Sequence, residues 1–210
     1  KHNSEFPLDV FQTGSGTSTN MNANEVIANL ASRFSGIEVD PNDDVNMSQS
    51  SNDVIPTAIK ISAYKDLTEK LYPALDKLIK EIEKKESSLK GIVKTGRTHL
   101  MDAMPLDISQ EFSAWSSQLK NVKKTLVFLE KRLLEMPLGG TAVGTGINAH
   151  PRFAKNFAKE LSSLIGGKCK ATSSENFFHE LSSQDTAVQV SGELKNLAVA
   201  LMKISNDLRW

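Results

Sequence analysis

The chain has 210 residues, and its 25 lysines and arginines are balanced by 25 aspartates and glutamates. Zero net charge argues against a field that attracts nucleic acid or a membrane surface, and no apolar run approaches the ~20 residues that a membrane span needs. The single cysteine, Cys169, excludes an internal disulfide and suits a reducing compartment.

Helical periodicity begins near the N-terminus. A short helix is predicted for residues 24–35, and a long one for residues 52–89. Apolar side chains in the long segment recur at spacings of three and four: Leu67, Leu71, Leu75, Leu78 and Ile82. Because the pattern continues beyond Pro73, we expect this proline to kink the helix rather than end it.

Three further helices are predicted in the rest of the chain. Residues 106–136 carry a heptad-like apolar stripe, made of Ile108, Phe112, Trp115, Leu119, Val122, Leu126, Leu129 and Leu133. A shorter helix is expected at 151–164, opening with a proline in its first turn. The last, at 174–210, contains Leu194, Leu197, Leu201, Ile204 and Leu208. No alternating run predicts a strand of useful length, so we predict a mainly α fold, an elongated bundle of long helices.

Polar loops rich in Ser, Thr, Asn and Gly separate these segments, at residues 13–20, 42–52, 96–99 and 138–148. Ser50 and Asp53 match the S-x-x-D form of a capping box at the start of the first long helix. The unpaired N–H groups and positive dipole of a helix start attract carboxylates. The loops therefore indicate a site for an anion, although an ordinary N-cap explains Ser50 equally well.

His99 is the strongest candidate for proton transfer, because an unperturbed imidazole has a pKa of about 6.5. Thr98 beside it could bind substrate, and Asp102 could fix the loop. His150, just before Pro151, is expected to cap or order a helix start. We expect no metal site, because the histidines are too dispersed for zinc-ligand spacing.

These motifs together resemble the class II fumarase and aspartase family. The resemblance covers essentially the whole chain in unbroken order, through FPLDVFQTGSGTSTNMNANEVIANLAS, PNDDVNMSQSSNDVIPTA, KTGRTHLMDAMPLDISQEFSAW, LGGTAVGTGINAHPRFA and SGELKNLAVALMKISNDLRW. His99 in GRTHL resembles fumarases, where an aspartase carries glutamine. Ser51 and the run from Asn148 to Pro151 also resemble fumarases, whereas TSTN at 17–20 leans toward aspartases.

The resemblance implies reversible hydration of fumarate to L-malate in the tricarboxylic acid cycle, without a cofactor. It implies that a first group of residues holds the substrate carboxylates: Ser15, Gly16, Thr17, Ser50, Ser51, Asn52 and Thr98. It gives His99 the role of relaying a proton to or from water. It further implies a homotetramer with active sites shared between subunits, in the cytoplasm or the mitochondrial matrix.

The resemblance also sets the expected organisation of the chain. Residues 1–47 would be the remainder of an N-terminal domain, and residues 48–210 the first part of a central helical bundle. The family's GSSxMPxKxN loop, which supplies a serine, a lysine and an asparagine to the site, would follow Trp210. We therefore expect an interior piece of a longer subunit, inactive alone.

A second, peripheral dicarboxylate site of the family resembles Asp40, Pro41, Asn42 and Asp43. Fumarases usually have histidine at the first of these positions, and an aspartate there would repel an anion. We therefore expect this secondary site not to bind in the usual way. Two alternatives to a fumarase stay open, namely an aspartate ammonia-lyase and a non-catalytic helical assembly module.

Overall fold

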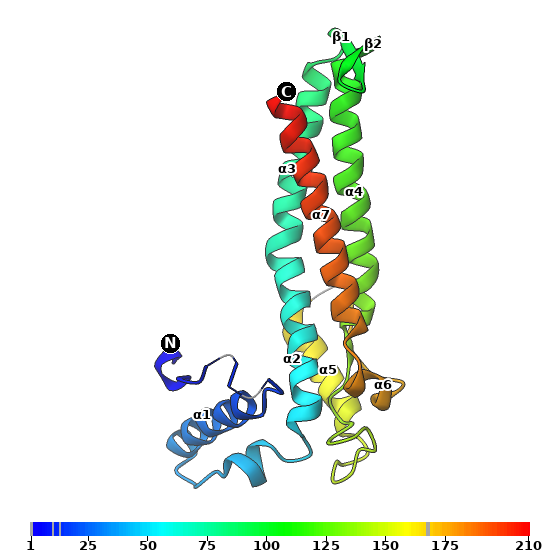
Figure 1. The fold of residues 1–210 in the computed structure, drawn as a ribbon. Coiled ribbons are helices and arrows are strands. Elements are labelled where there is room, and N and C mark those ends of the chain that lie inside the picture. The colour runs from blue at the N-terminus through cyan, green and yellow to red at the C-terminus, as the bar shows by residue number, and fades with distance from the viewer. Residues whose placement is uncertain (1, 10, 13, 167–168) are drawn as a thin grey trace. The chain divides into compact units, whose positions relative to one another are not determined.

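The computed structural model describes residues 2–9, 11–12, 14–166 and 169–210, and these residues are mainly helical (Figure 1). The mainly α fold predicted from the sequence is confirmed. The helices are α1 (Thr17–Ser35), α2 (Ser51–Asp66), α3 (Tyr72–Ser88), α4 (Ile108–Leu133), α5 (Phe153–Ile165), α6 (Phe177–Ser182) and α7 (Asp185–Arg209). None of the described helices is long and apolar enough to cross a membrane.

The chain divides into two compact units, described separately below. Unit 1 comprises Lys1–Ala63 and Lys131–Ala187, and unit 2 comprises Tyr64–Glu130 and Val188–Trp210. The domain boundary expected near residue 47 stays a prediction, because the division into units follows contacts within this chain alone.

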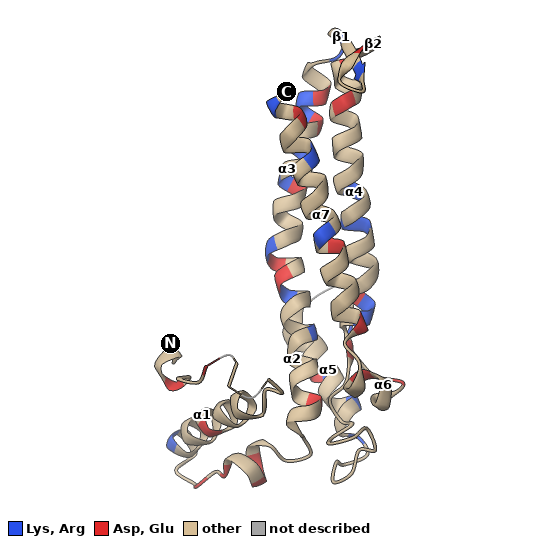
Figure 2. Cartoon of the chain, viewed as in Figure 1, with Lys and Arg blue, Asp and Glu red and all other residues tan. Residues whose placement is uncertain are grey.

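Unit 2 is a bundle in which α3, α4 and α7 lie side by side (Figure 1). The predicted α4 stripe forms its core, with Trp115, Leu119, Val122, Leu126 and Leu129 all buried. Cross-helix contacts are also polar, since the Trp115 Nε1–H donates to Asp207 at 3.1 Å and Lys123 pairs with Asp76 at 2.5 Å. Positive and negative side chains are interspersed along α3 and α4 (Figure 2), in keeping with the zero net charge.

The long helix expected at 52–89 is interrupted by one wide, π-type turn at Leu67–Leu71. This turn ends just before Pro73, in the first turn of α3. Proline has no N–H and its ring crowds the carbonyl four residues earlier, so a regular α-helical turn would be strained here. The wide turn shifts the buried face. Tyr72 and Ile79 are buried, whereas Leu71 is half-buried and Leu78 is 37% exposed. The predicted stripe was therefore wrong at two positions.

Two strands that the sequence did not predict form an antiparallel hairpin, β1 (Val93–Thr98) and β2 (Met101–Asp107). Most of their side chains are exposed, so no apolar alternation marks them. The pairing is irregular between Thr95 and Arg97, where Gly96 lets the strands approach closely. A Cβ at Gly96 would lie 2.5 Å from the Met104 carbonyl oxygen.

Unit 1 contains α1, α5, α6, most of α2 and the first turn of α7. A two-residue parallel pair joins β3 (Glu135–Met136) to β4 (Thr172–Ser173). The single helix expected at 174–210 is broken between α6 and α7, because Ser183 takes an extended conformation. The first helix is longer than predicted, since α1 begins at Thr17.

Candidate functional site

The starts of α1 and α2 meet in unit 1 through their side-chain hydroxyls. The Thr17 Oγ1 lies 3.1 Å from the Ser15 Oγ and 3.2 Å from the Ser51 Oγ. Gly16 precedes α1 in the left-handed region, with φ 79°, and no side chain caps the helix there. Two helix N-termini therefore converge on one cluster of hydroxyls, and the start of α1 carries no side-chain cap, an arrangement suited to carboxylates.

Gly16 must be glycine for a second reason. A Cβ at this position would lie 2.7 Å from the Cγ1 and Cδ1 atoms of Ile55, a residue in the first turns of α2. The close approach brings the start of α1 against α2. The glycine thereby sets the spacing between the two hydroxyl-bearing segments.

The capping box predicted at α2 is present. The Ser50 Oγ accepts the Asn52 N–H at 3.2 Å, and the Asp53 carboxylate accepts the Ser50 N–H at 2.9 Å. Asp53 is completely buried, and its second oxygen accepts the N–H groups of Gly139 at 3.0 Å and Thr141 at 2.8 Å. Burial raises the pKa of the Asp53 carboxyl, and these backbone N–H donors offset part of the rise.

The glycine-rich loop 138–148 is thus attached to the start of α2. The Asn52 side-chain amide adds a further contact, because its Nδ2 donates to the Ala142 carbonyl oxygen at 2.9 Å. From the sequence, this loop is recognisable as polar and glycine-rich, but it has no predicted role in the site. Its partners lie 86 to 90 residues away along the chain, and no local pattern in the sequence encodes such a pairing.

A cavity of about 570 Å³ opens beside these groups. Its polar lining includes Ser15, Ser51 and Asn52, and none of its lining residues is charged. A ligand there would meet hydroxyls, an amide and two helix starts rather than a fixed cation from unit 1. Any full positive charge for an anionic ligand would have to come from elsewhere.

Thr98 and His99 belong to unit 2, at the tip of the β1–β2 hairpin. Thr98 pairs with Met101, so His99 and Leu100 are the two central residues of the turn. Both are in the left-handed region, with φ 52° and 62°, as a type I′ hairpin turn requires. His99 is exposed, and Asp102 lies 4.0 Å from the Arg97 Nε across the hairpin. The expected role of Asp102 in fixing the loop is consistent with that contact.

The segment that resembles a secondary site is a short turn, Pro41–Val45, after Asp40. The Asp40 carboxylate accepts the N–H groups of Asn42 at 2.7 Å and Asp43 at 2.8 Å. The Asp40 N–H in turn donates to the Asp44 carboxylate at 2.8 Å. A carboxylate of the chain itself thus occupies the donors that an anion would use. The expected loss of ordinary binding here stays a prediction.

Two further polar groups make contacts within unit 1. The His150 Nδ1 accepts the Arg152 N–H at 3.2 Å just before α5, which fits the expected ordering of that helix start, whereas the expected cap is absent because no side chain caps α5. A second cluster joins His179, Ser183 and Asp185 between α6 and α7. In this cluster the serine hydroxyl donates to the aspartate rather than to the histidine, so the serine–histidine hydrogen bond typical of an activated serine nucleophile is not formed. Thr13, in the first polar loop, lies outside the described residues.

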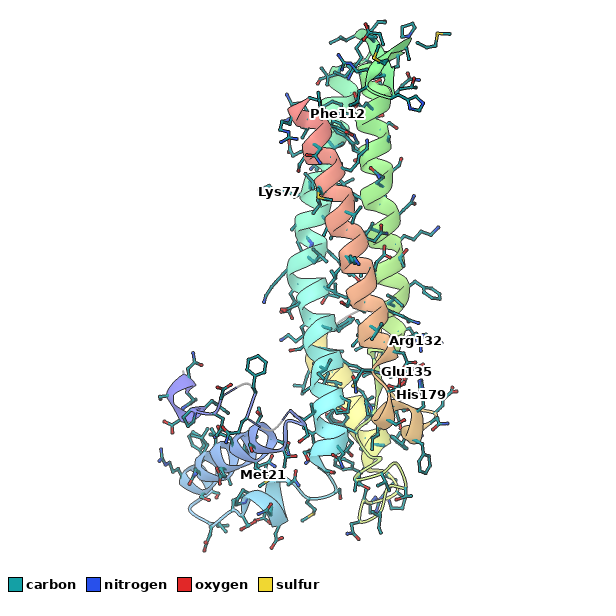
Figure 3. The ribbon with its side chains drawn as sticks, viewed as in Figure 1. Met21, Lys77, Phe112, Arg132, Glu135 and His179 are labelled. Atoms are coloured by element: carbon teal, nitrogen blue, oxygen red, sulfur yellow. The ribbon has the colours of Figure 1, made fainter. Side chains whose placement is uncertain are left out.

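Unit 1 also holds a buried ion pair that no pattern in the sequence indicates. Lys60 of α2 pairs with Glu180 of α6, and both side chains are at least nine-tenths buried. The Lys60 ammonium also donates to the carbonyl oxygens of Arg132 at 3.3 Å and Glu135 at 2.9 Å, residues labelled in Figure 3. All three ammonium hydrogens therefore have acceptors. The pair ties the helix that carries Ser51 and Asn52 to the rest of unit 1.

The chain resembles known proteins along its whole length. The model of a protein family described as Lyase matches residues 1–210. A class II fumarate hydratase from Xylella fastidiosa is 55% identical over 210 residues, which are 100% of this chain and 44% of that protein. The fumarate hydratase class II 2 of Pseudomonas aeruginosa is 55% identical over 98% of this chain and 44% of its own length.

A solved structure gives the same result. The crystal structure of a class II fumarase from Schistosoma mansoni matches with a TM-score of 0.94 and 37% identity, over 98% of this chain and 47% of that chain. This chain therefore spans less than half the length of the relatives that it matches.

Proposed function

Because the chain belongs to the lyase family whose model spans residues 1–210, we propose that it is part of a fumarate hydratase, which interconverts fumarate and L-malate. The observation that carries the proposal is the convergence of two helix starts on one hydroxyl cluster, in a chain 55% identical to class II fumarate hydratases. The same relatives speak against an aspartate ammonia-lyase.

The chemistry needs an anion-stabilising pocket. Removing the proton next to a carboxylate puts further negative charge on the substrate, which preorganised N–H and O–H donors stabilise. We assign the substrate carboxylates to residues at the two helix starts, Ser15, Gly16, Thr17, Ser50, Ser51 and Asn52. These groups are held in place before substrate arrives, so little reorganisation is needed during the reaction.

Thr98 and His99, which belong to unit 2, are the further residues that we assign to the substrate. Thr98 would donate to a substrate carboxylate, and His99 would transfer a proton to or from the water that adds across the double bond. The exposed position of His99 at a hairpin tip leaves its imidazole accessible to a partner surface.

The proposal includes a homotetramer whose subunits share active sites. It is supported by large apolar side chains that remain exposed on α4 and α7 of unit 2, namely Val127, Phe128, Val199, Met202 and Leu208. Apolar stripes of this kind are typical of helices that pack against further helices. We place the enzyme in the tricarboxylic acid cycle, without a cofactor, in the cytoplasm or the mitochondrial matrix.

Ultraviolet absorbance tests the proposal directly. The protein at its native length is mixed with L-malate, and the conjugated double bond of fumarate is followed as absorbance rises. L-Aspartate is the parallel substrate, because an ammonia-lyase would produce the same signal from it alone. A folded protein that leaves both substrates unchanged and binds no dicarboxylate would support the assembly-module alternative and exclude the hydratase.

A further inference from the structure

The buried carboxylate of Asp53 connects two parts of the proposed site. One oxygen accepts the Ser50 N–H at 2.9 Å, and the other accepts the N–H groups of Gly139 and Thr141 at 3.0 and 2.8 Å. The side chain is completely buried, so water cannot substitute for it. Asp53 is thus the group that holds the loop around Thr141 against the start of α2.

This loop has a shape that its own sequence disfavours. Thr141 is β-branched, yet it lies in the left-handed region with φ 56°. It is 5% exposed, and its hydroxyl has no hydrogen-bond partner among the described residues. Local preferences alone would move the loop elsewhere. An external bond is required to maintain it, and Asp53 supplies that bond at the Thr141 N–H itself.

Ala142, the residue after Thr141, links the position of the loop to the site. The Ala142 carbonyl oxygen accepts a hydrogen bond from the Asn52 Nδ2 at 2.9 Å, and both residues line the 570 Å³ cavity. Because the amide group is planar, committing one N–H also sets the direction of its second N–H and of its oxygen. The position of Ala142 therefore decides how Asn52 faces the cavity.

We propose that Asp53 is a positioning residue for the dicarboxylate site. It holds the loop in a strained shape, so that the Ala142 carbonyl orients the Asn52 amide toward the substrate. The inference rests on the proposed function, because the substrate class comes from there. Asp53 itself touches no substrate and acts only through the loop.

Two substitutions at this position separate geometry from charge. Asp53→Ala removes every acceptor of the carboxylate, so the loop is no longer held. We expect KM for fumarate to rise about tenfold while kcat stays within about twofold. This is the pattern expected when substrate and transition state lose the same binding interaction. Asp53→Asn keeps one acceptor oxygen, which can still receive the N–H groups of Gly139 and Thr141. The KM of Asp53→Asn is therefore expected to stay close to the wild-type value.

A third variant tests the strain. Glycine adopts the left-handed region freely. Adding Thr141→Gly to the Asp53→Ala variant should therefore lower the raised KM part of the way back to the wild-type value. Alone, Thr141→Gly should leave KM unchanged, because Asp53 still holds the loop. The matched control is Thr57→Val, which removes a buried 2.7 Å bond to the Asp53 backbone carbonyl without touching the loop. It should lower the melting temperature and leave KM unchanged.

Hydrogen exchange of the Gly139 and Thr141 amides provides a readout independent of turnover. Asp53→Ala should remove their protection, and Asp53→Asn and Thr57→Val should preserve it. If the wild-type protein had no hydratase activity, the proposed function would be wrong. Hydrogen exchange would still test whether Asp53 holds the loop around Thr141. The inference is overturned if Asp53→Ala leaves these amides protected, if Thr57→Val raises KM equally, or if Thr141→Gly alone raises KM as Asp53→Ala does.

Discussion

His99 combines an ionisable ring with an unusual backbone. It shares the turn of the β1–β2 hairpin with Leu100, and both residues have positive φ. Asparagine is among the residues that tolerate this region, so replacing His99 with asparagine changes the ring without adding backbone strain. The position is therefore well suited to a test of proton transfer.

For His99→Asn we expect kcat for fumarate hydration to fall by about 10²–10⁴-fold, the usual contribution of one general acid–base group, with little change in KM. Steady-state rates of the protein at its native length measure both constants. Leu100→Asn is the control, since it makes a similar change at the neighbouring turn position and should keep the wild-type kcat. Equal losses in the two variants would assign the effect to the turn rather than to the imidazole.

At the scale of single residues, the sequence predicted contacts that are local. The capping pair of Ser50 and Asp53 was recognisable because its members are three residues apart. The bonds from Asp53 to Gly139 and Thr141 were not, because their partners lie 86 and 88 residues away. The left-handed turn at His99 also escaped prediction, since neither His99 nor Leu100 is a residue typical of such a turn.

Between elements, the buried Lys60–Glu180 pair is a contact whose loss should be costly. Lys60→Met leaves a buried carboxylate and two carbonyl oxygens without their donor. We expect the free energy of unfolding to fall by about 3–5 kcal/mol, as when one partner of a buried ion pair is removed. Urea unfolding of unmodified and variant protein gives the difference.

The double variant Lys60→Met/Glu180→Leu tests whether the loss comes from the unpaired charge. Replacing both charges by apolar side chains removes the unpaired carboxylate, so it should recover much of the loss. A double variant that is destabilised by the sum of the two single changes would show that the ion pair is not the coupling contact between α2 and α6.

The start of α7 predicts a response to acid. Hydrogen bonds from Ser183 and then from His179 lower the pKa of the Asp185 carboxyl, and Arg132 lies 3.8 Å from it. A carboxyl with a lowered folded-state pKa stabilises the fold above its unfolded pKa of about 4, and this stabilisation is lost as pH falls through the folded-state value. Asp185→Asn should therefore cost stability at pH 6 but progressively less below about pH 4.

Urea midpoints of wild type and Asp185→Asn, compared from pH 6 down to pH 3, test this expectation. The difference between the two proteins should shrink below about pH 4, because the Asp185 carboxyl takes up a proton in the unfolded chain while the folded carboxylate, with its lowered pKa, stays ionised. A constant difference across that range would mean that Asp185 acts through shape or helix capping and not through its charge.

At the scale of elements, periodicity identified the long helices because their buried faces repeat over many turns. The α4 stripe was predicted residue for residue from Trp115 to Leu133. The hairpin was missed because its side chains are mostly exposed and give no alternation. The break between α6 and α7 was missed because Ser183 leaves the helix in the absence of any proline or glycine.

For the whole molecule, the proposed assembly depends on the apolar face of unit 2. Phe128 on α4 is 77% exposed, and Val127 beside it is 44% exposed, so two neighbouring apolar side chains face outward on this helix. Placing a charge there should disrupt a helix–helix interface, so Phe128→Asp is expected to reduce the mass measured by light scattering from tetramer to smaller species. Phe34→Asp on α1, at a phenylalanine that is 88% exposed, should keep the tetramer.

A tetramer that survives Phe128→Asp would place the interface elsewhere.

For the function of the whole molecule, the resemblance in sequence motifs was more informative than composition or periodicity. Composition and periodicity lead to a helical bundle, but they do not identify a substrate. The assignment of both Ser51 and His99 to the substrate follows from the resemblance in sequence motifs alone.

The wide turn at Leu67–Leu71 has a consequence for changes in chain length. A single π-type turn accommodates one residue more than an α-helical turn while the helix continues on either side. Deleting one residue here would close the turn to α geometry and keep Tyr72 and Ile79 facing the core, at the cost of crowding between the Pro73 ring and the carbonyl four residues earlier. The same deletion between Leu75 and Ile82 would rotate all that follows by about 100°. A one-residue deletion in the turn should therefore disturb the buried face less than a deletion within α3.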